Sequence, residues 1–182
     1  MNRIFIPSLN IRERMKLSDQ EIARMTFNRE KKQILEITIL RKDFRFKCQR
    51  CAVFCCKLGG PIVNKLDLKR LAKTGLNPSE FIEPVRRHHD QQGDAIGVLK
   101  QKDDGSCIFL KYDASTGLYE CGIYKARPNV CRLYPFEFIL EGNEKGVLRV
   151  IPCCNGLNAP NGRLVDREFI RKHLLDAIRE IL

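Results

Sequence analysis

The chain has 182 residues, which is enough for one well-filled core and too few for two ordinary domains. It contains nine cysteines, and because this number is odd, a complete disulfide framework would leave one unpaired. The first fifteen residues hold no apolar run of signal-peptide length, and no stretch approaches the roughly 20 apolar residues of a membrane helix. We therefore expect a cytoplasmic protein without membrane contact, whose clustered cysteines bind metal.

The net charge of +11 is concentrated at the start of the chain, where residues 1–47 hold 12 Lys/Arg against 6 Asp/Glu. A basic region of this kind suits a polyanion such as RNA, but it is also compatible with a solvated helix face or with docking on an acidic protein. The candidate nucleic-acid-binding residues are Arg12, Arg14, Lys16, Lys31 and Lys32.

The first elements are predicted from local signals. A capping-box pattern at Ser18–Glu21, followed by apolar residues at helical spacing, predicts a helix from about Asp19 into the thirties. Residues 34–40 are rich in β-branched side chains and could finish this helix or start a strand. The alternation of residues 44–47 favours an extended approach to Cys48.

The middle of the chain alternates between helix and strand signals. A short helix is predicted over residues 67–74, ending at Gly75, and Asn77–Pro78 should start a second helix that reaches about His89. Three short apolar runs separated by Gly, Asp and Ser turns then predict strands, namely residues 96–99, 107–110 and 118–124.

The last third predicts a hairpin followed by a helix. Residues 136–140 and 147–151 flank a polar, glycine-containing turn, so they should form a β-hairpin that leads into Cys153 and Cys154. Apolar residues then recur at intervals of three and four between Val165 and Ile181, which is typical of an amphipathic helix.

These elements predict a small single α+β domain of short antiparallel strands and helices, stapled by one or more thiolate metal sites. Residues 1–43 would be a basic N-terminal extension that is largely helical. Residues 44–156 would form the cysteine-cluster metal-binding domain, and residues 157–182 a C-terminal helix that packs on it.

The cysteines themselves give the strongest chemical signal. Cys48 and Cys51 form a C-x2-C pair, a spacing that aims two sulfurs at one metal in both zinc and iron–sulfur sites. Cys55 and Cys56 are adjacent, and because neighbouring side chains diverge in irregular backbone, each could serve a different site. The remaining candidate ligands lie beside predicted strands and turns: Cys107, Cys121, Cys131, Cys153 and Cys154.

Two arrangements remain open. Two four-thiolate sites would use eight cysteines, whereas a single cluster would leave several structural thiols. In either case we expect one site to contain Cys48, Cys51 and one of the adjacent pair, with a fourth ligand from Cys121 or Cys131. The three histidines lie where helix capping or surface exposure is expected, so the ligand set is all sulfur, which suits zinc or iron–sulfur chemistry.

Three segments, Phe46–Cys56, Cys107–Leu110 and Cys121–Phe136, resemble the YkgJ-type cysteine-cluster family. Its members are described as zinc- or iron-chelating and often as containing an iron–sulfur cluster, so the resemblance implies such a cofactor. The likeness covers about residues 44–136. The family usually places a glycine after the second cysteine, where this chain has Ala52, and the spacing to the next cysteines is longer here.

The segment around Cys131 adds residues that could surround the thiolates. Pro128 biases Arg127 toward extended backbone, so a turn should present Cys131. Arg127 and Arg132 could place positive charge near the sulfurs, or could instead form salt bridges to acids on neighbouring strands. Together with Tyr134 they are the candidate residues of the surrounding shell.

Three functions follow from these observations. The first is an iron–sulfur protein, for example with a [4Fe–4S] cluster, in a redox, maturation or structural role. The alternative is a zinc-stapled binding module that docks through its basic N-terminal region on RNA or a large ribonucleoprotein assembly. The third is an accessory related to protein lysine methyltransferases, since a related cysteine cluster occurs in a flagellin lysine N-methylase. No glycine-rich nucleotide loop or catalytic constellation is recognisable, so we assign no catalytic residue and no small-molecule substrate.

Overall fold

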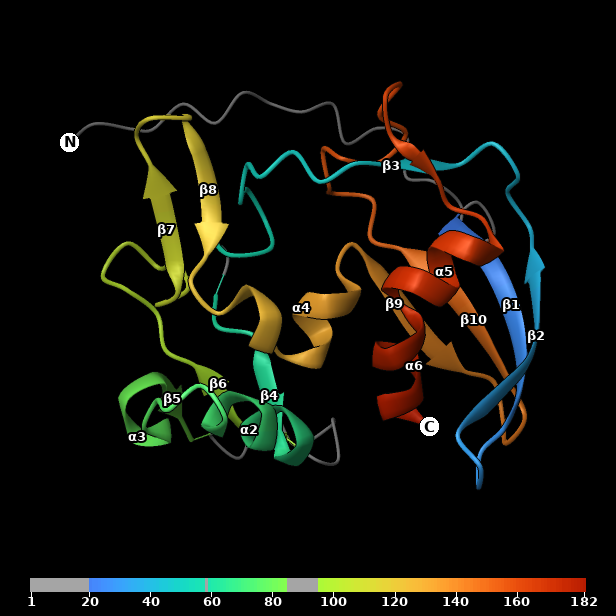
Figure 1. The fold of residues 1–182 in the computed structure, drawn as a ribbon, viewed down its shortest axis with the longest axis horizontal. Helices are drawn as coiled ribbons and strands as arrows, with labels where there is room; N and C mark the ends of the chain where they lie inside the picture. The colour runs from blue at the N-terminus through green and yellow to red at the C-terminus, as the bar shows by residue number, and fades with distance from the viewer. Residues whose placement is uncertain (1–19, 58, 85–94) are drawn as a thin grey trace.

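The computed structural model describes residues 20–57, 59–84 and 95–182. Figure 1 shows two groups of elements side by side, with the short helix α4 (Asn129–Leu133) between them. One group is a sheet covered by the two C-terminal helices, and the other consists of two small sheets with two short helices. Each group has its own cluster of buried apolar side chains.

The larger sheet has four antiparallel strands in the order β2-β1-β10-β9. Two hairpins, β1–β2 and β9–β10, meet where β1 pairs with β10 in a register that sets Ala23 opposite Leu148. The predicted hairpin before Cys153 and Cys154 is thus confirmed. The strands are β1 (Glu21–Asn28), β2 (Gln33–Ile39), β9 (Phe136–Leu140) and β10 (Lys145–Val150).

The helix predicted from about Asp19 into the thirties is wrong over the described residues, because β1 and β2 occupy this segment. Ala23, Met25 and Phe27 are buried at every second position, which is the period of a strand facing a core on one side. Ile22 and Met25 also fit helical spacing. In so short a segment the pattern of apolar residues cannot distinguish a helix from a strand, and only the pairing with β10 decides between them.

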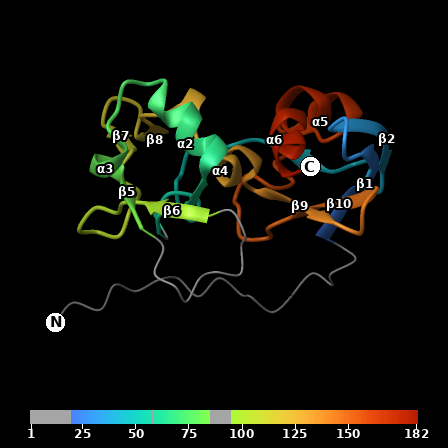
Figure 2. The ribbon, with the colours of Figure 1, turned by 90° about the horizontal axis from the view of Figure 1, so that it is seen from below.

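Helices α5 (Arg167–His173) and α6 (Leu175–Ile181) cover one face of the four-stranded sheet, as Figure 2 shows. The apolar stripe predicted for this region packs against the sheet strands in the first core cluster. The single predicted helix is divided at Leu174, which ends α5 and begins α6. Asp166 starts α5 by accepting a 2.8 Å hydrogen bond from the Phe169 amide.

The second group contains the antiparallel sheet β4-β6-β5 and the helices α2 and α3. The helix expected from Asn77–Pro78 to about His89 ends at Phe81, and residues 82–83 form a strand instead. Residues 85–89 of that prediction lie outside the described residues. The elements are β4 (Ile62–Asn64), α2 (Lys65–Ala72), α3 (Pro78–Phe81), β5 (Ile82–Glu83) and β6 (Ala95–Leu99).

A close backbone approach explains why strand pairing replaces the helix after Phe81. β5 pairs with β6, and a Cβ atom added to Gly97 would stand 2.4 Å from Ile82 Cγ2 and 2.6 Å from the Glu83 carbonyl oxygen. The missing side chain at residue 97 therefore lets β5 lie against β6.

A hairpin of β7 (Leu110–Asp113) and β8 (Leu118–Cys121) follows, and the 3-10 turn η2 (Tyr124–Ala126) leads into α4. The strand predicted at residues 107–110 begins only at Leu110, although Cys107 makes an isolated bridge with Gln101. The strand predicted at 118–124 ends at Cys121, where the chain turns into η2.

One short ladder connects the segment before the first cysteines with the C-terminal part of the chain. Strand β3 (Arg45–Phe46) pairs antiparallel with β11 (Arg163–Leu164), and the Lys47 amide donates to the Gly156 carbonyl at 3.0 Å. The extended approach to Cys48 is confirmed, and Phe46 also forms an isolated bridge with Leu157, just after Cys153 and Cys154.

The molecule is a small α+β domain in which every described strand pair is antiparallel. Within residues 20–57, 59–84 and 95–182, no helix is long and apolar enough to cross a membrane. Of the predicted N-terminal extension, residues 1–19 lie outside the described part, and residues 21–39 belong to the main sheet. The proposed domain boundaries stay a prediction.

Candidate metal centre

The loop from Cys48 to Cys56 runs from one group of elements to the other. It begins beside the β3–β11 ladder and then passes the β7–β8 hairpin, where Arg50 and Tyr119 exchange two 3.0 Å hydrogen bonds. At its far end the Cys107 amide donates to the Cys56 carbonyl oxygen at 2.7 Å. The backbone thus holds the two ends of the cysteine loop against different parts of the molecule.

Two residues of this loop have left-handed backbone conformations. Arg50 has a φ of 51° and Ala52 has a φ of 55°, a region that side chains with a Cβ rarely adopt. Ala52 is also buried, at 5% exposure. Glycine, the residue that the family pattern usually has here, would adopt this conformation without steric cost.

All nine cysteines lie in the described part of the chain, and all are free thiols. Cys48 and Cys55 are exposed, Cys107 is buried, and the other six are partly buried. The thiols come from the cysteine loop, the strand region before β7, the end of β8, the middle of α4 and the turn after β10.

Four of these cysteines lie near one another at the second core: Cys56, Cys107, Cys121 and Cys131. We call them the α4 thiol group. Burial raises the pKa of the Cys131 thiol to about 12, and the negative charges of Cys107 and Cys121 add to the rise. Burial likewise raises the pKa of Cys107, and the charge of Cys121 acts in the same direction. Cys56 packs against the same apolar cluster as Cys107 and Cys121.

The other four lie where β3 meets the turn after β10: Cys48, Cys51, Cys153 and Cys154. We call them the β3 thiol group. Burial raises the pKa of Cys154, and the charges of Cys48 and Cys51 add to this rise, whereas a hydrogen bond from the Gly156 amide opposes it. That amide stands 3.4 Å from the Cys154 sulfur. Hydrogen bonds of this type stabilise a thiolate.

Cys55 precedes Cys56 in the loop and interacts with thiols of both groups. A hydrogen bond from the Cys56 thiol to its sulfur lowers the pKa of Cys55 to about 7, and the positive charge of Arg127 acts in the same direction. The charge of Cys55 adds to the rise in pKa of all four thiols of the α4 thiol group, and of Cys154 in the β3 thiol group.

The three residues expected around the thiolates take different roles. Arg127 stacks on the Tyr124 ring at 3.9 Å, and its charge opposes the rise that burial causes in the pKa of Cys121. Arg132 instead donates to the carboxylate of Glu180 on α6, at 2.5 Å. Tyr134 ends α4, and its hydroxyl oxygen lies 3.6 Å from the Cys153 sulfur.

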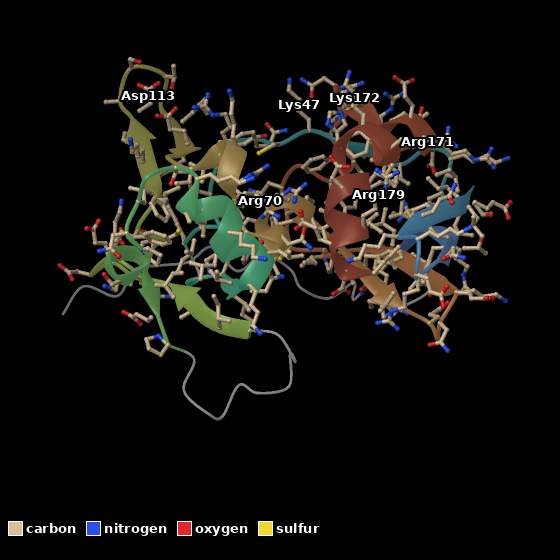
Figure 3. All side chains as sticks on the ribbon, turned by 60° about the horizontal axis from the view of Figure 1, so that its bottom comes forward. Lys47, Arg70, Asp113, Arg171, Lys172 and Arg179 are labelled. Carbon is tan, nitrogen blue, oxygen red and sulfur yellow. The ribbon has the colours of Figure 1, made fainter. Side chains whose placement is uncertain are left out.

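A buried polar network, which the sequence reasoning missed, fixes α4 and therefore Cys131. Asp67 is 1% exposed and accepts hydrogen bonds from the Asn129 amide at 2.8 Å and from Arg70 at 2.9 Å. Arg70 also donates to the Arg127 carbonyl and to Glu180, and in Figure 3 its side chain lies between α2 and α6. The spacing of Asn64 and Asp67, which form a capping box, was the available signal.

Of the candidate nucleic-acid-binding residues, Arg12, Arg14 and Lys16 lie outside the described residues. Lys31 and Lys32 are exposed in the turn between β1 and β2, away from the cysteine loop in sequence and on another element. Contact with RNA stays a prediction.

The donor set fits a thiophilic metal. Among the described residues, the groups whose charges raise the pKa of these thiols are other cysteine sulfurs, and this is the chemistry of structural zinc and of iron–sulfur clusters. In the described part of the chain, no three Cys, His, Asp or Glu side chains already surround one point closely enough to hold an ion. Neutral thiols attract one another only weakly, so ligation itself would have to draw them together.

Comparison with known proteins agrees with this chemistry. The sequence profile of the CxxCxxCC family, described as "Putative zinc- or iron-chelating domain", matches residues 47–162. A curated relative is an uncharacterized protein of Methanocaldococcus jannaschii, 30% identical over 142 residues, which span 76% of this chain and 72% of the relative. No solved structure matches the chain.

Proposed function

Because this chain belongs to the CxxCxxCC family of zinc- or iron-chelating domains, we propose that it binds its metal as an iron–sulfur cluster held by cysteine thiolates. That the chain is a metal-binding cysteine-cluster protein follows from the family itself. The cluster would act in a redox, maturation or structural role.

The observation that carries the proposal is the gathering of thiols from five separate segments. Cysteines that are distant in sequence change one another's pKa, as Cys107 and Cys121 do for Cys131, and Cys48 and Cys51 do for Cys154. Thiolates placed together in a partly buried region are unfavourable, so without a cation these thiols stay protonated. A bound metal would compensate the charge and let them ligate as thiolates.

Two features favour a cluster over a closed zinc site. First, polar groups contact the sulfurs: the Gly156 amide donates to Cys154, and the Tyr134 hydroxyl lies 3.6 Å from the Cys153 sulfur. Hydrogen bonds to the sulfurs tune the potential of a cluster. Second, Cys48 is exposed, which would leave a bound cluster within reach of a redox partner. When bound, the cluster would supply one-electron chemistry that the side chains lack.

The test is metal and acid-labile sulfide analysis of the full chain, purified without oxygen and without added metal. We expect iron and sulfide in comparable amounts, together with a broad visible absorbance that dithionite bleaches. Stoichiometric zinc without iron would overturn the cluster and support the zinc-stapled alternative. A protein that holds neither metal would overturn both.

A further inference from the structure

We propose that the cysteines form two separate four-thiolate metal sites, one from each thiol group, and that Cys55 is required by neither. The β3 site would use Cys48, Cys51, Cys153 and Cys154, and the α4 site would use Cys56, Cys107, Cys121 and Cys131. This inference rests on the proposed function, because it assumes that the thiols bind metal, and it holds for a cluster or for zinc.

Backbone pairing separates the two groups independently of the side chains. The start of the cysteine loop is tied to the turn after β10, because the Lys47 amide donates to Gly156. Its end is tied to the second core, because the Cys107 amide donates to Cys56. Each end of the loop is therefore fixed beside a different set of downstream cysteines.

Side-chain packing divides the thiols in the same way. Cys56, Cys107 and Cys121 lie together in the second apolar core cluster. The Cys154 sulfur instead lies 3.4 Å from the Gly156 amide, and the Gly156 carbonyl accepts from Lys47, the residue before Cys48.

Tyr134 lies where the groups meet, since it follows Cys131 by one helical turn and its hydroxyl lies 3.6 Å from Cys153. The two sites would thus be neighbours on opposite sides of this ring.

Of the two adjacent cysteines, Cys56 is assigned as a metal ligand and Cys55 is not. Cys56 is partly buried, packs against the second core and has its carbonyl bonded to Cys107, so its side chain belongs with the α4 site. Cys55 is exposed, and unlike Cys56 it is not part of the second core cluster. In this assignment, Cys153 and Cys154 complete the site that contains Cys48 and Cys51. The sequence alone suggested Cys121 or Cys131 as the fourth ligand of that site.

The experiment compares metal content in full chains purified without oxygen. We expect two equivalent centres per chain in the native protein, and loss of half the metal in Cys154→Ser and in Cys131→Ser. The double variant should retain none, and Cys55→Ser, the matched control, should retain all. Circular dichroism of each variant checks that the sheet is still folded.

A second measurement on the native protein avoids any folding defect of the variants. Alkylation of the metal-loaded chain, followed by mass spectrometry, should modify Cys55 first and leave eight cysteines protected until chelator is added. Protection of four cysteines only, or complete loss of metal in both single variants while they remain folded, would overturn the two-site arrangement and leave the proposed function standing. Unprotected cysteines in a native protein without metal would overturn both.

Discussion

Ala52 shows how a single backbone angle bears on the cysteine loop. Its φ of 55° lies in the left-handed region, and the residue is buried directly after Cys51. A side chain with a Cβ costs about 1–2 kcal/mol in this conformation. The loop therefore carries local strain at the position where the family pattern has glycine, and this strain must be offset by the contacts that hold the loop.

We predict that Ala52→Gly changes the free energy of unfolding by less than about 1 kcal/mol, because relief of the left-handed strain offsets the greater freedom of the unfolded chain. Ala126→Gly is the matched control, since Ala126 is also buried but has no positive φ. That variant should lose roughly 1 kcal/mol or more. Urea unfolding measures both, and equal losses would contradict the strain.

Cys51 is the residue whose replacement should affect metal and stability together. We predict that Cys51→Ser lowers the metal content and the melting temperature, because site formation and folding are coupled. Val53→Ser is the control, since Val53 is an exposed residue of the same loop without a ligating atom. Metal analysis and thermal unfolding provide the readout, and full metal content with an unchanged melting curve in Cys51→Ser would exclude it as a ligand.

Asp113 offers a pH prediction remote from the thiols, in the turn between β7 and β8 labelled in Figure 3. Hydrogen bonds from the Ser115 and Thr116 hydroxyls lower the pKa of its carboxyl group from 3.8 to about 2. The carboxylate therefore stabilises the hairpin turn above about pH 4, and this contribution is lost as the pH falls toward 2.

Carboxyl-carbon NMR titration of Asp113 checks this expectation. The native midpoint should lie near 2, and Ser115→Ala should raise it toward 3.8, because the largest cause of the lowered pKa is removed. A midpoint that does not move in the variant would show that these hydroxyl contacts do not hold the charge.

At the scale of elements, α4 is too short to keep its own position. It spans five residues, and the residue at its N-cap position, Pro128, makes no side-chain capping hydrogen bond. Its neighbours supply what it lacks: α2 through Asp67 and Arg70, and α6 through Glu180 and the Ala177 carbonyl, which accepts from Asn129 at 3.0 Å. Cys131 and Tyr134 therefore depend on side chains from distant parts of the sequence.

We predict that Asp67→Ala lowers the free energy of unfolding by about 3–5 kcal/mol, because it leaves buried partners of a charged group unpaired. Asp176→Ala removes an exposed ion pair with Arg179, on the α6 face labelled in Figure 3, and should cost less than about 0.5 kcal/mol. Chemical denaturation distinguishes the two. Losses of similar size would mean that Asp67 is not the hub of the network.

The β1 segment shows where local reasoning about elements fails. The capping-box pattern around Glu21 predicted a helix, yet the carboxylate of Glu21 bonds to Arg24 and Arg149 in the sheet. The segment satisfies both helical and strand periods, and its pairing with β10 decides between them. Where flanking signals were unambiguous, as for the β9–β10 hairpin, the elements were predicted correctly.

For the whole molecule, two apolar cores are joined by α4 and by the cysteine loop. One core lies between the four-stranded sheet and the helices α5 and α6, and the other lies among α2, β4 and β6. The loop crosses between them with a few backbone hydrogen bonds, among them Tyr119 to Arg50 and Cys107 to Cys56. Coordination of the loop cysteines to a bound metal would add metal–sulfur bonds between the two parts of the molecule, which few backbone hydrogen bonds join.

We predict that removing the metal with a chelator speeds hydrogen exchange at the Tyr119 and Cys107 amides, because the loop that accepts their hydrogen bonds is no longer tied down. Amides between β1 and β10 are the internal control and should keep their protection, since the first core does not include the thiols. Uniform loss of protection across both regions would show instead that the whole domain unfolds without metal.

The sequence by itself indicated metal binding, which the family match supports, and because ligand type depends on side-chain atoms, its nine cysteines predict thiolate sites. It also determined elements whose signals are local, such as the β9–β10 hairpin and the helix that ends before Gly75, which has a φ of 79°. The tertiary structure decided that residues 21–39 are strands and which thiols are neighbours. Both depend on pairings such as β1 with β10 and Lys47 with Gly156, whose register no short-range pattern encodes.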